Sequence, residues 1–236
     1  MSRRIPRFVL LLFCSAAVLF AQEHDLGYYP ETLRGEVWIE MEPVYGAYVD
    51  EEYPLDGKAA SKRALEEAAL FYSAMIYGWS FHYDIGEKAR KIPEQFELVP
   101  VALIPFGDPG LRITEVEMKD MRVRLWTDYH LTESQQRRMQ IWRKGIIRSA
   151  QAVGYGSLGG PVAISGWLEI KKAALEDAAR AAVRGILRGS ERNRPKEASG
   201  FISLASFPRY FMDSGRWAAA ARFRVEIKEI IPFAAY

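Results

Sequence analysis

The sequence predicts an α+β fold in which a largely antiparallel sheet packs against about three amphipathic helices. Three segments place apolar side chains at helical spacing, and several strand-like segments follow one another without a helix between them. Strands that are joined directly to strands favour antiparallel pairing. We therefore expect the element order β-α-β-β-α-α-β-β, and we find no repeat of fixed period that would suggest a solenoid or an array.

The first half of the chain supplies four of these elements. Residues 36–42 alternate between apolar and polar side chains, as in a half-buried strand. A helix is predicted over 58–79, because its apolar residues share one stripe. The run 98–106 contains two prolines, which is typical of an edge strand or an extended segment. Residues 113–126 resemble a strand that changes phase, which predicts a bulge or tight turn near Lys119-Asp120.

Two helices are predicted in the second half. Thr132 and Gln135 fit a capping box at the start of the first. We expect this helix to continue to Gly154, where glycine can stop it. Its buried residues would be Met139, Trp142, Ile146, Ala150 and Val153. A glycine-rich connection over 154–166 then leads to the second helix at 167–187.

The C-terminal part of the chain predicts a hairpin. Residues 201–211 and 217–231 have strand character, and Asp213-Ser214-Gly215 lies between them as a turn. Apolar and charged side chains alternate most clearly over 222–228, which makes this the best-defined strand of the sequence.

The N-terminus has the parts of a secretory signal peptide. Arg3, Arg4 and Arg7 precede an apolar run over 8–20, and the small residue Ala21 ends it. A membrane-spanning helix needs about 20 apolar residues, so this run is short for one. We expect cleavage after Ala21 and therefore no transmembrane helix in the mature chain.

Two alternatives to simple cleavage remain at this end of the chain. The segment could stay as an uncleaved anchor, or Cys14 could be lipidated, since residues 11–14 loosely resemble a lipoprotein cleavage box. Cys14 is the single cysteine of the sequence. If it leaves with the signal, the mature chain has no thiol, which excludes disulfides and cysteine-ligated zinc.

The chain divides by charge into three parts. After the signal peptide at 1–21, residues 22–56 form an acidic, aromatic-rich segment with one strand, and residues 57–236 form one globular α+β domain. The full chain carries a net charge of +2, and removing three arginines leaves a charge close to zero. This balance gives no reason to expect nucleic acid as a partner.

Basic side chains on the predicted helices are the candidate binding residues. They are Arg137, Arg138, Arg143, Lys144 and Arg148 on one helix, and Arg180, Arg184 and Arg188 on the next. Such rows attract an anionic lipid, glycan or acidic protein, although rows of this kind are also common on solvated helix faces.

The sequence contains no catalytic or metal motif, and we assign no cofactor. His82-Tyr83-Asp84 and Asp128-Tyr129-His130 are mirror-image triplets that would hold a divalent metal if they met in space. The glycine-rich segment lacks the spacing of a nucleophile elbow and the lysine of a phosphate-binding loop.

These observations favour an exported, non-catalytic protein of the periplasm or cell envelope that binds another envelope protein or an anionic lipid or glycan. Attachment to the outer membrane and full secretion are alternative destinations. Two alternative functions are a secreted hydrolase or metal-dependent enzyme using His82, Asp84, Asp128 and His130, and a structural subunit of an envelope assembly.

Overall fold

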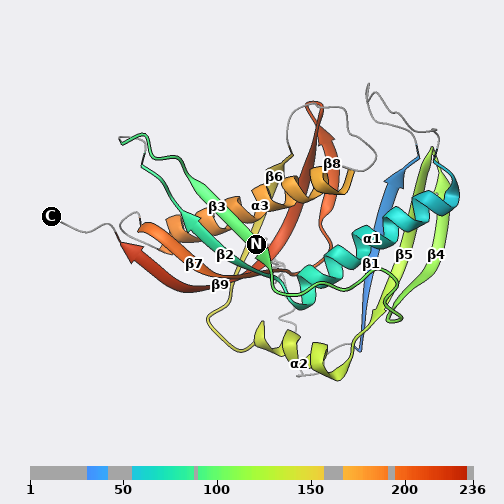
Figure 1. Ribbon diagram of the computed structural model, residues 1–236, viewed down its shortest axis with the longest axis horizontal. Coiled ribbons are helices and arrows are strands. Elements are labelled where there is room, and N and C mark those ends of the chain that lie inside the picture. The colour runs from blue at the N-terminus through green and yellow to red at the C-terminus, as the bar shows by residue number, and fades with distance from the viewer. Residues whose placement is uncertain (1–30, 42–54, 88–89, 157–166, 191–194, 233–236) are drawn as a thin grey trace, which may run out of the picture.

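The structure is a computed structural model that describes residues 31–41, 55–87, 90–156, 167–190 and 195–232. This part of the chain forms three helices and two antiparallel sheets, which confirms the α+β class (Figure 1). The predicted signal peptide, with Cys14, lies outside the described residues, as do residues 157–166 of the glycine-rich connection. Among the residues that are described, no helix has the length and apolarity needed to cross a bilayer.

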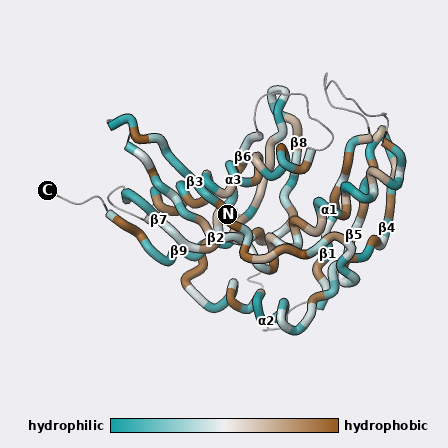
Figure 2. Tube along the Cα trace, viewed as in Figure 1, coloured by the Kyte–Doolittle hydropathy of each residue, from teal (hydrophilic) through white to brown (hydrophobic). Residues whose placement is uncertain are grey.

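The smaller sheet has three strands in the order β1-β5-β4. Their bounds are β1 (Thr32–Glu40), β4 (Leu111–Lys119) and β5 (Arg122–His130). Helix α1 (Gly57–Ile76) packs on one face of β1 and β5. Val37, Ile39, Val123 and Leu125 are buried, as the period of two in a one-sided sheet requires. Strongly hydrophobic residues alternate with less hydrophobic ones along these strands (Figure 2).

The larger sheet has six strands, with the path β3-β2-β7-β9-β6 and with β8 paired to β9. Their bounds are β2 (Trp79–Asp84), β3 (Gln95–Pro100), β6 (Arg148–Tyr155), β7 (Pro195–Leu204), β8 (Arg209–Asp213) and β9 (Arg216–Pro232). Helix α3 (Trp167–Ser190) packs on β6 and β9. It lies so close to β6 that a Cβ on Gly154 would stand 1.9 Å from the backbone nitrogen of Ala178.

One aromatic side chain joins the two sheets. Between β7 and β8 the chain leaves the edge of β9, and Phe207 packs there against Phe71 and Tyr72 of α1. A Cβ on Gly35 of β1 would lie 2.2 Å from the Phe207 ring. The Tyr72 hydroxyl donates to the carbonyl of Thr127 at 2.8 Å. Buried apolar residues of both sheets therefore form one continuous cluster.

Several local predictions are confirmed. Helix α2 (Glu133–Ile141) starts at the predicted capping box, in which Thr132 and Gln135 bond each other in both directions. The tight turn between β4 and β5 lies at Asp120-Met121, where both residues have positive φ. The turn between β8 and β9 lies at Ser214-Gly215, also with positive φ.

The helix that was predicted to run from the capping box at Thr132 to Gly154 ends at Ile141 instead, so this prediction is wrong beyond that residue. Residues 148–155 form β6 and pair with β9, so that Ala150, Ala152 and Gly154 face α3 at the period of a strand. Small residues are needed on this face of β6 because α3 approaches it closely. In the sequence, the same small residues were misread as part of the apolar stripe of a helix. Ile146, expected to be buried, is 83% exposed.

Strand β2 was not foreseen, because the apolar stripe of α1 continues through Trp79. The helix ends at Ile76, and Gly78 then takes a φ of +70°, which turns the chain into the sheet. Of the apolar run 98–106, only its start belongs to edge strand β3, which ends at Pro100. The observed order is β-α-β-β-β-β-α-β-α-β-β-β, which has four more strands than predicted.

Candidate functional site

A cavity of about 350 Å³ lies between helices α1 and α3. Its lining comes from α1, from α3, from β2 and β3, and from the segment that follows β3. The lining residues are Glu66, Ala69, Leu70, Ser73, Trp79, Leu98, Pro100, Leu103, Ile104, Phe106, Leu168, Glu169, Lys172, Leu175, Glu176 and Ala179. Most of them are apolar, as in small-molecule and peptide pockets.

The segment after β3 forms the outer wall of this cavity. The Ser73 hydroxyl of α1 donates to the carbonyl of Ala69 at 2.6 Å and accepts from the backbone nitrogen of Ile104 at 2.8 Å. This contact fixes the segment against the helix. Leu103 and Phe106 remain 61% and 56% exposed on the wall. The wall therefore presents apolar surface that no described part of the chain covers.

The charges of the lining are mainly negative. Glu169 pairs with Lys172 at 2.7 Å, and Glu66 pairs with Lys62 at 3.9 Å. Glu176 has no ion pair within the described residues. Burial, followed by the charge of Glu169, raises the pKa of its carboxyl, and the charge of Lys172 opposes that shift. Three carboxylates and one ammonium thus line an apolar hollow.

A buried ion pair joins the same two helices beside the cavity and is closed to solvent. Lys171 and Glu67, each next in sequence to a residue of the cavity, form an ion pair at 2.6 Å and are 4% and 2% exposed. Burial raises the pKa of Glu67, and the charge of Lys171 opposes that shift. The partners of both charged groups are thus supplied by the protein itself.

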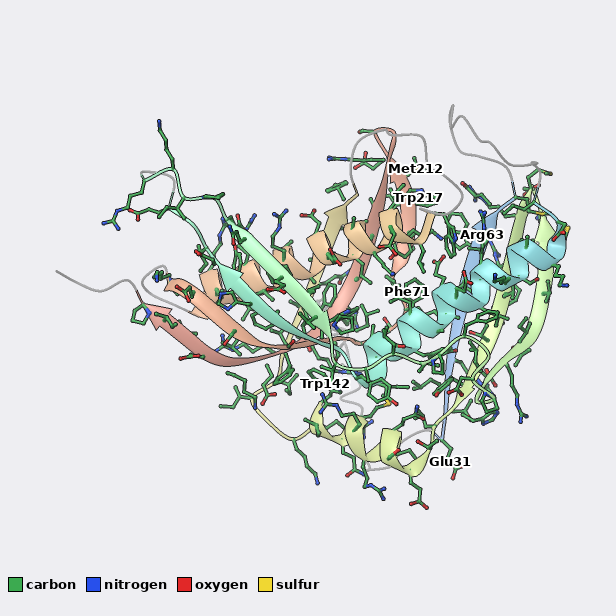
Figure 3. All side chains as sticks on the ribbon, viewed as in Figure 1. Glu31, Arg63, Phe71, Trp142, Met212 and Trp217 are labelled. Carbon is green, nitrogen blue, oxygen red and sulfur yellow. The ribbon has the colours of Figure 1, made fainter. Side chains whose placement is uncertain are left out.

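Aromatic rings surround the ammonium of Lys171. Its nitrogen lies 5.2–5.6 Å from the ring centroids of Trp38, Trp167, Tyr210 and Trp217, close enough for cation–π attraction. Trp217 and Arg63, near this group, are marked in Figure 3. The rings come from β1, α3, β8 and β9, so the cage holds both sheets and α3 together.

The predicted basic residues near α2 do not form one row. Arg137 pairs with Glu133 at 3.5 Å, and Arg138 donates to the carbonyl of Tyr77 at 3.3 Å. Because α2 ends at Ile141, Arg143 and Lys144 lie in the turn that follows it and Arg148 lies on β6.

The predicted row on α3 is partly neutralised by the protein itself. Arg180 pairs with Asp177. Arg184 pairs with Glu94 and donates to the Tyr83 hydroxyl at 3.1 Å. Burial disfavours ionisation of Glu94, but the hydrogen bonds from Arg184 and Tyr83 outweigh it and lower the Glu94 pKa. Arg188 is exposed near the end of the helix.

The two histidine–aspartate triplets belong to different sheets. His82 and Asp84 lie on β2, whereas Asp128 and His130 lie on β5. His130 is hydrogen-bonded to Thr32 at 2.9 Å, and Asp128 pairs with Arg34 at 3.4 Å. Within the described part of the chain, no three His, Cys, Asp or Glu side chains gather in a way that could hold a metal ion.

A model of an uncharacterised protein family matches residues 27–233. The chain belongs to this family. It is also similar to an uncharacterized protein from Treponema pallidum (strain Nichols), with 26% identity over 206 residues that cover 87% of the chain and 83% of the relative. No solved structure matches the chain. The family match thus includes both helices that line the cavity.

Sequence reasoning missed the cavity, although it identified most of the segments that form it. Leu70 and Leu175 each look like ordinary core residues of an amphipathic helix. The available signal was the run 98–106, whose two prolines interrupt a strand while its other residues stay apolar. An apolar run that does not continue as a strand can instead form the wall of a surface cavity, as it does here.

Proposed function

We propose that this family member is an exported, non-catalytic protein of the cell envelope that binds a partner polypeptide through the cavity between α1 and α3. The observation that carries the proposal is the combination of an apolar lining with an excess of carboxylates. The partner would insert a large apolar side chain and place a lysine or arginine beside it.

The lining favours such a partner over an anionic lipid or glycan. Glu66, Glu169 and Glu176 would repel an anion, whereas a cation beside Glu176 would give that carboxylate the ion pair it lacks. Exposed Leu103 and Phe106 would be covered at the same time, and burial of apolar surface is the usual driving force for association.

The export part of the proposal is supported by the sequence of residues 1–21. Three arginines, an apolar run and a small residue follow in the order that a secretory signal requires. Expression of the full chain in a bacterial host, followed by intact-mass measurement, tests it. A mature protein that begins at Gln22 is expected; recovery of the uncleaved chain from the cytosol would refute export.

Binding is tested with two fluorescent twelve-residue peptides that share a central Leu-Phe pair and differ only in flanking lysines or glutamates. We expect the lysine peptide to bind at least tenfold more tightly than the glutamate peptide. Leu103→Ser should weaken this binding, because Leu103 forms the exposed wall of the cavity.

The matched control is Val116→Ser, since Val116 is similarly exposed but lies on β4 and does not line the cavity. This variant should bind the lysine peptide as tightly as the wild-type protein does. Equal affinity for both peptides, or equal losses in the two variants, would contradict the cavity as the partner site.

A further inference from the structure

Strand β6 leaves one edge of the larger sheet unpaired within the described residues. It is the last strand of the sheet path and pairs with β9 alone. Unpaired edges carry free N–H and C=O groups that can pair with another extended chain. The free edge of β6 is therefore a potential template for strand addition.

A groove of about 490 Å³ runs along this edge, between β6 and the C-terminal half of α3. Four consecutive residues of β6 line it, from Arg148 to Gln151, so side chains of both faces border the groove. The wall from α3 is made of small side chains and one isoleucine. These residues are Ala181, Ala182, Gly185, Ile186 and Gly189. A Cβ added at Gly185 or Gly189 would meet no atom within 4 Å, so the groove has open space there.

Among the described residues, Arg148 has no counterion in this groove. Its Nη1 atom is buried and has no hydrogen-bond partner. No carboxylate of the described chain lines the groove. Asp177, further along α3, is already bonded to Arg180 and to the backbone nitrogen of Tyr155. Exposed Arg188 and Arg222 lie on α3 and on the strand that pairs with β6. A carboxylate in the groove would give Arg148, which lines it, the counterion that the described chain does not supply.

We infer that the groove is a second binding site, which takes an extended acidic peptide as an added strand on β6. The backbone of the peptide would pair with the free edge, and an aspartate, glutamate or C-terminal carboxylate would bind Arg148. Strand addition gives affinity through main-chain hydrogen bonds, and side-chain pockets give specificity.

The charges favour this occupant over a second copy of the chain. Strand β6 contains no acidic residue, so its pairing with a second β6 would supply no carboxylate to Arg148 of either molecule. A small free anion would satisfy Arg148 but would leave the edge of β6 unpaired.

A display library of random ten-residue peptides, selected on the mature protein, tests the inference. Selected peptides should alternate β-branched residues with aspartate or glutamate, and their binding should slow hydrogen exchange at the amides of β6. Arg148→Met should lower their affinity at least tenfold. Gly185→Phe should do the same by filling the groove, and it replaces a helical glycine with a better helix former.

Arg112→Met is the control, because Arg112 is an exposed arginine on β4, an edge strand of the other sheet. It should leave peptide affinity unchanged, as should Leu103→Ser in the cavity wall. Peptides that lack acidic residues, or that bind Arg148→Met as well as wild type, would overturn the inference. Competition by inorganic phosphate without protection of β6 would instead indicate a small-anion site and would also overturn it.

Discussion

Helices α1 and α3 meet in two regions that differ in one respect: whether the protein supplies the partners of its own charged groups. Glu67 and Lys171 form a buried ion pair inside an aromatic cage. The neighbouring residues Glu66 and Lys172 line an open cavity, where Glu176 forms no close ion pair within the described chain. The buried ion pair, which we call the closed region, and the cavity, which we call the open region, are thus formed by adjacent residues on each helix.

The difference separates structural residues from candidate binding residues. A buried charge without a partner is costly, so the closed region should lose stability when one of its two partners is removed. A carboxylate that is only partly buried at a cavity costs less, so the open region can keep one without an ion pair for a ligand. We therefore expect substitutions in the closed region to change stability, and those in the open region to change binding.

The largest expected effect comes from removing one partner of the closed pair. Glu67→Gln or Lys171→Met should lower the free energy of unfolding by about 3–5 kcal/mol, because the remaining group stays buried without its partner. Urea denaturation measures this change. The double variant Glu67→Leu/Lys171→Met should recover most of the loss, since it leaves no buried charge.

Glu66→Gln and Lys172→Met are the matched controls at the adjacent positions. Their ion pairs are partly exposed, so each should change the free energy of unfolding by less than about 1 kcal/mol. If the two single variants of the closed pair were as mild as these controls, the contrast between the regions would fail.

The next effect tests the packing between the two sheets. Gly35→Ala places a methyl group 2.2 Å from the Phe207 ring, and it should destabilise the protein by about 1–3 kcal/mol through overpacking. Thermal unfolding measures the loss. Phe207→Leu in the same chain should relieve part of it. A Gly35→Ala variant as stable as wild type would show that the ring moves freely.

Features that depend on residues close together in the sequence could largely be predicted. The capping box of α2 and the inner faces of α1 and α3 depend on contacts a few residues apart, and periodicity reports such contacts directly. Strand β6 was misassigned because Ala150, Ala152 and Gly154 are small for a reason that lies in another element, the close approach of α3.

The candidate sites depended on long-range partners and were therefore mostly hidden. Arg184 looks like one member of an exposed basic row, but its partner Glu94 lies 90 residues away in the chain. Glu67 likewise meets Lys171 across 104 residues. Of the eight predicted basic residues, Arg148 is the one that we assign to a groove, and it was first placed on the wrong element.

The smallest expected effect is at Glu176 in the open region, where one substitution should change the free energy of unfolding and the peptide affinity in opposite directions. The folded-state pKa of Glu176 is raised by burial and by the charge of Glu169, so the folded protein holds its proton more tightly than the unfolded chain does. The stability that this group contributes is fully present below its unfolded pKa and is lost as the pH rises through the folded pKa. Glu176→Gln should remove this pH dependence and should stabilise the protein slightly at neutral pH, by less than about 0.5 kcal/mol.

The same substitution should weaken binding of the lysine peptide, because the carboxylate that would pair with its cation is gone. In the wild-type protein, this affinity should fall as the pH is lowered through the raised pKa of Glu176. Urea denaturation and fluorescence titration over the same pH range measure the two effects. Opposite signs are expected at a position kept for a ligand, since what costs the free protein is recovered in the complex. A loss of stability with unchanged affinity would instead place Glu176 with the closed region.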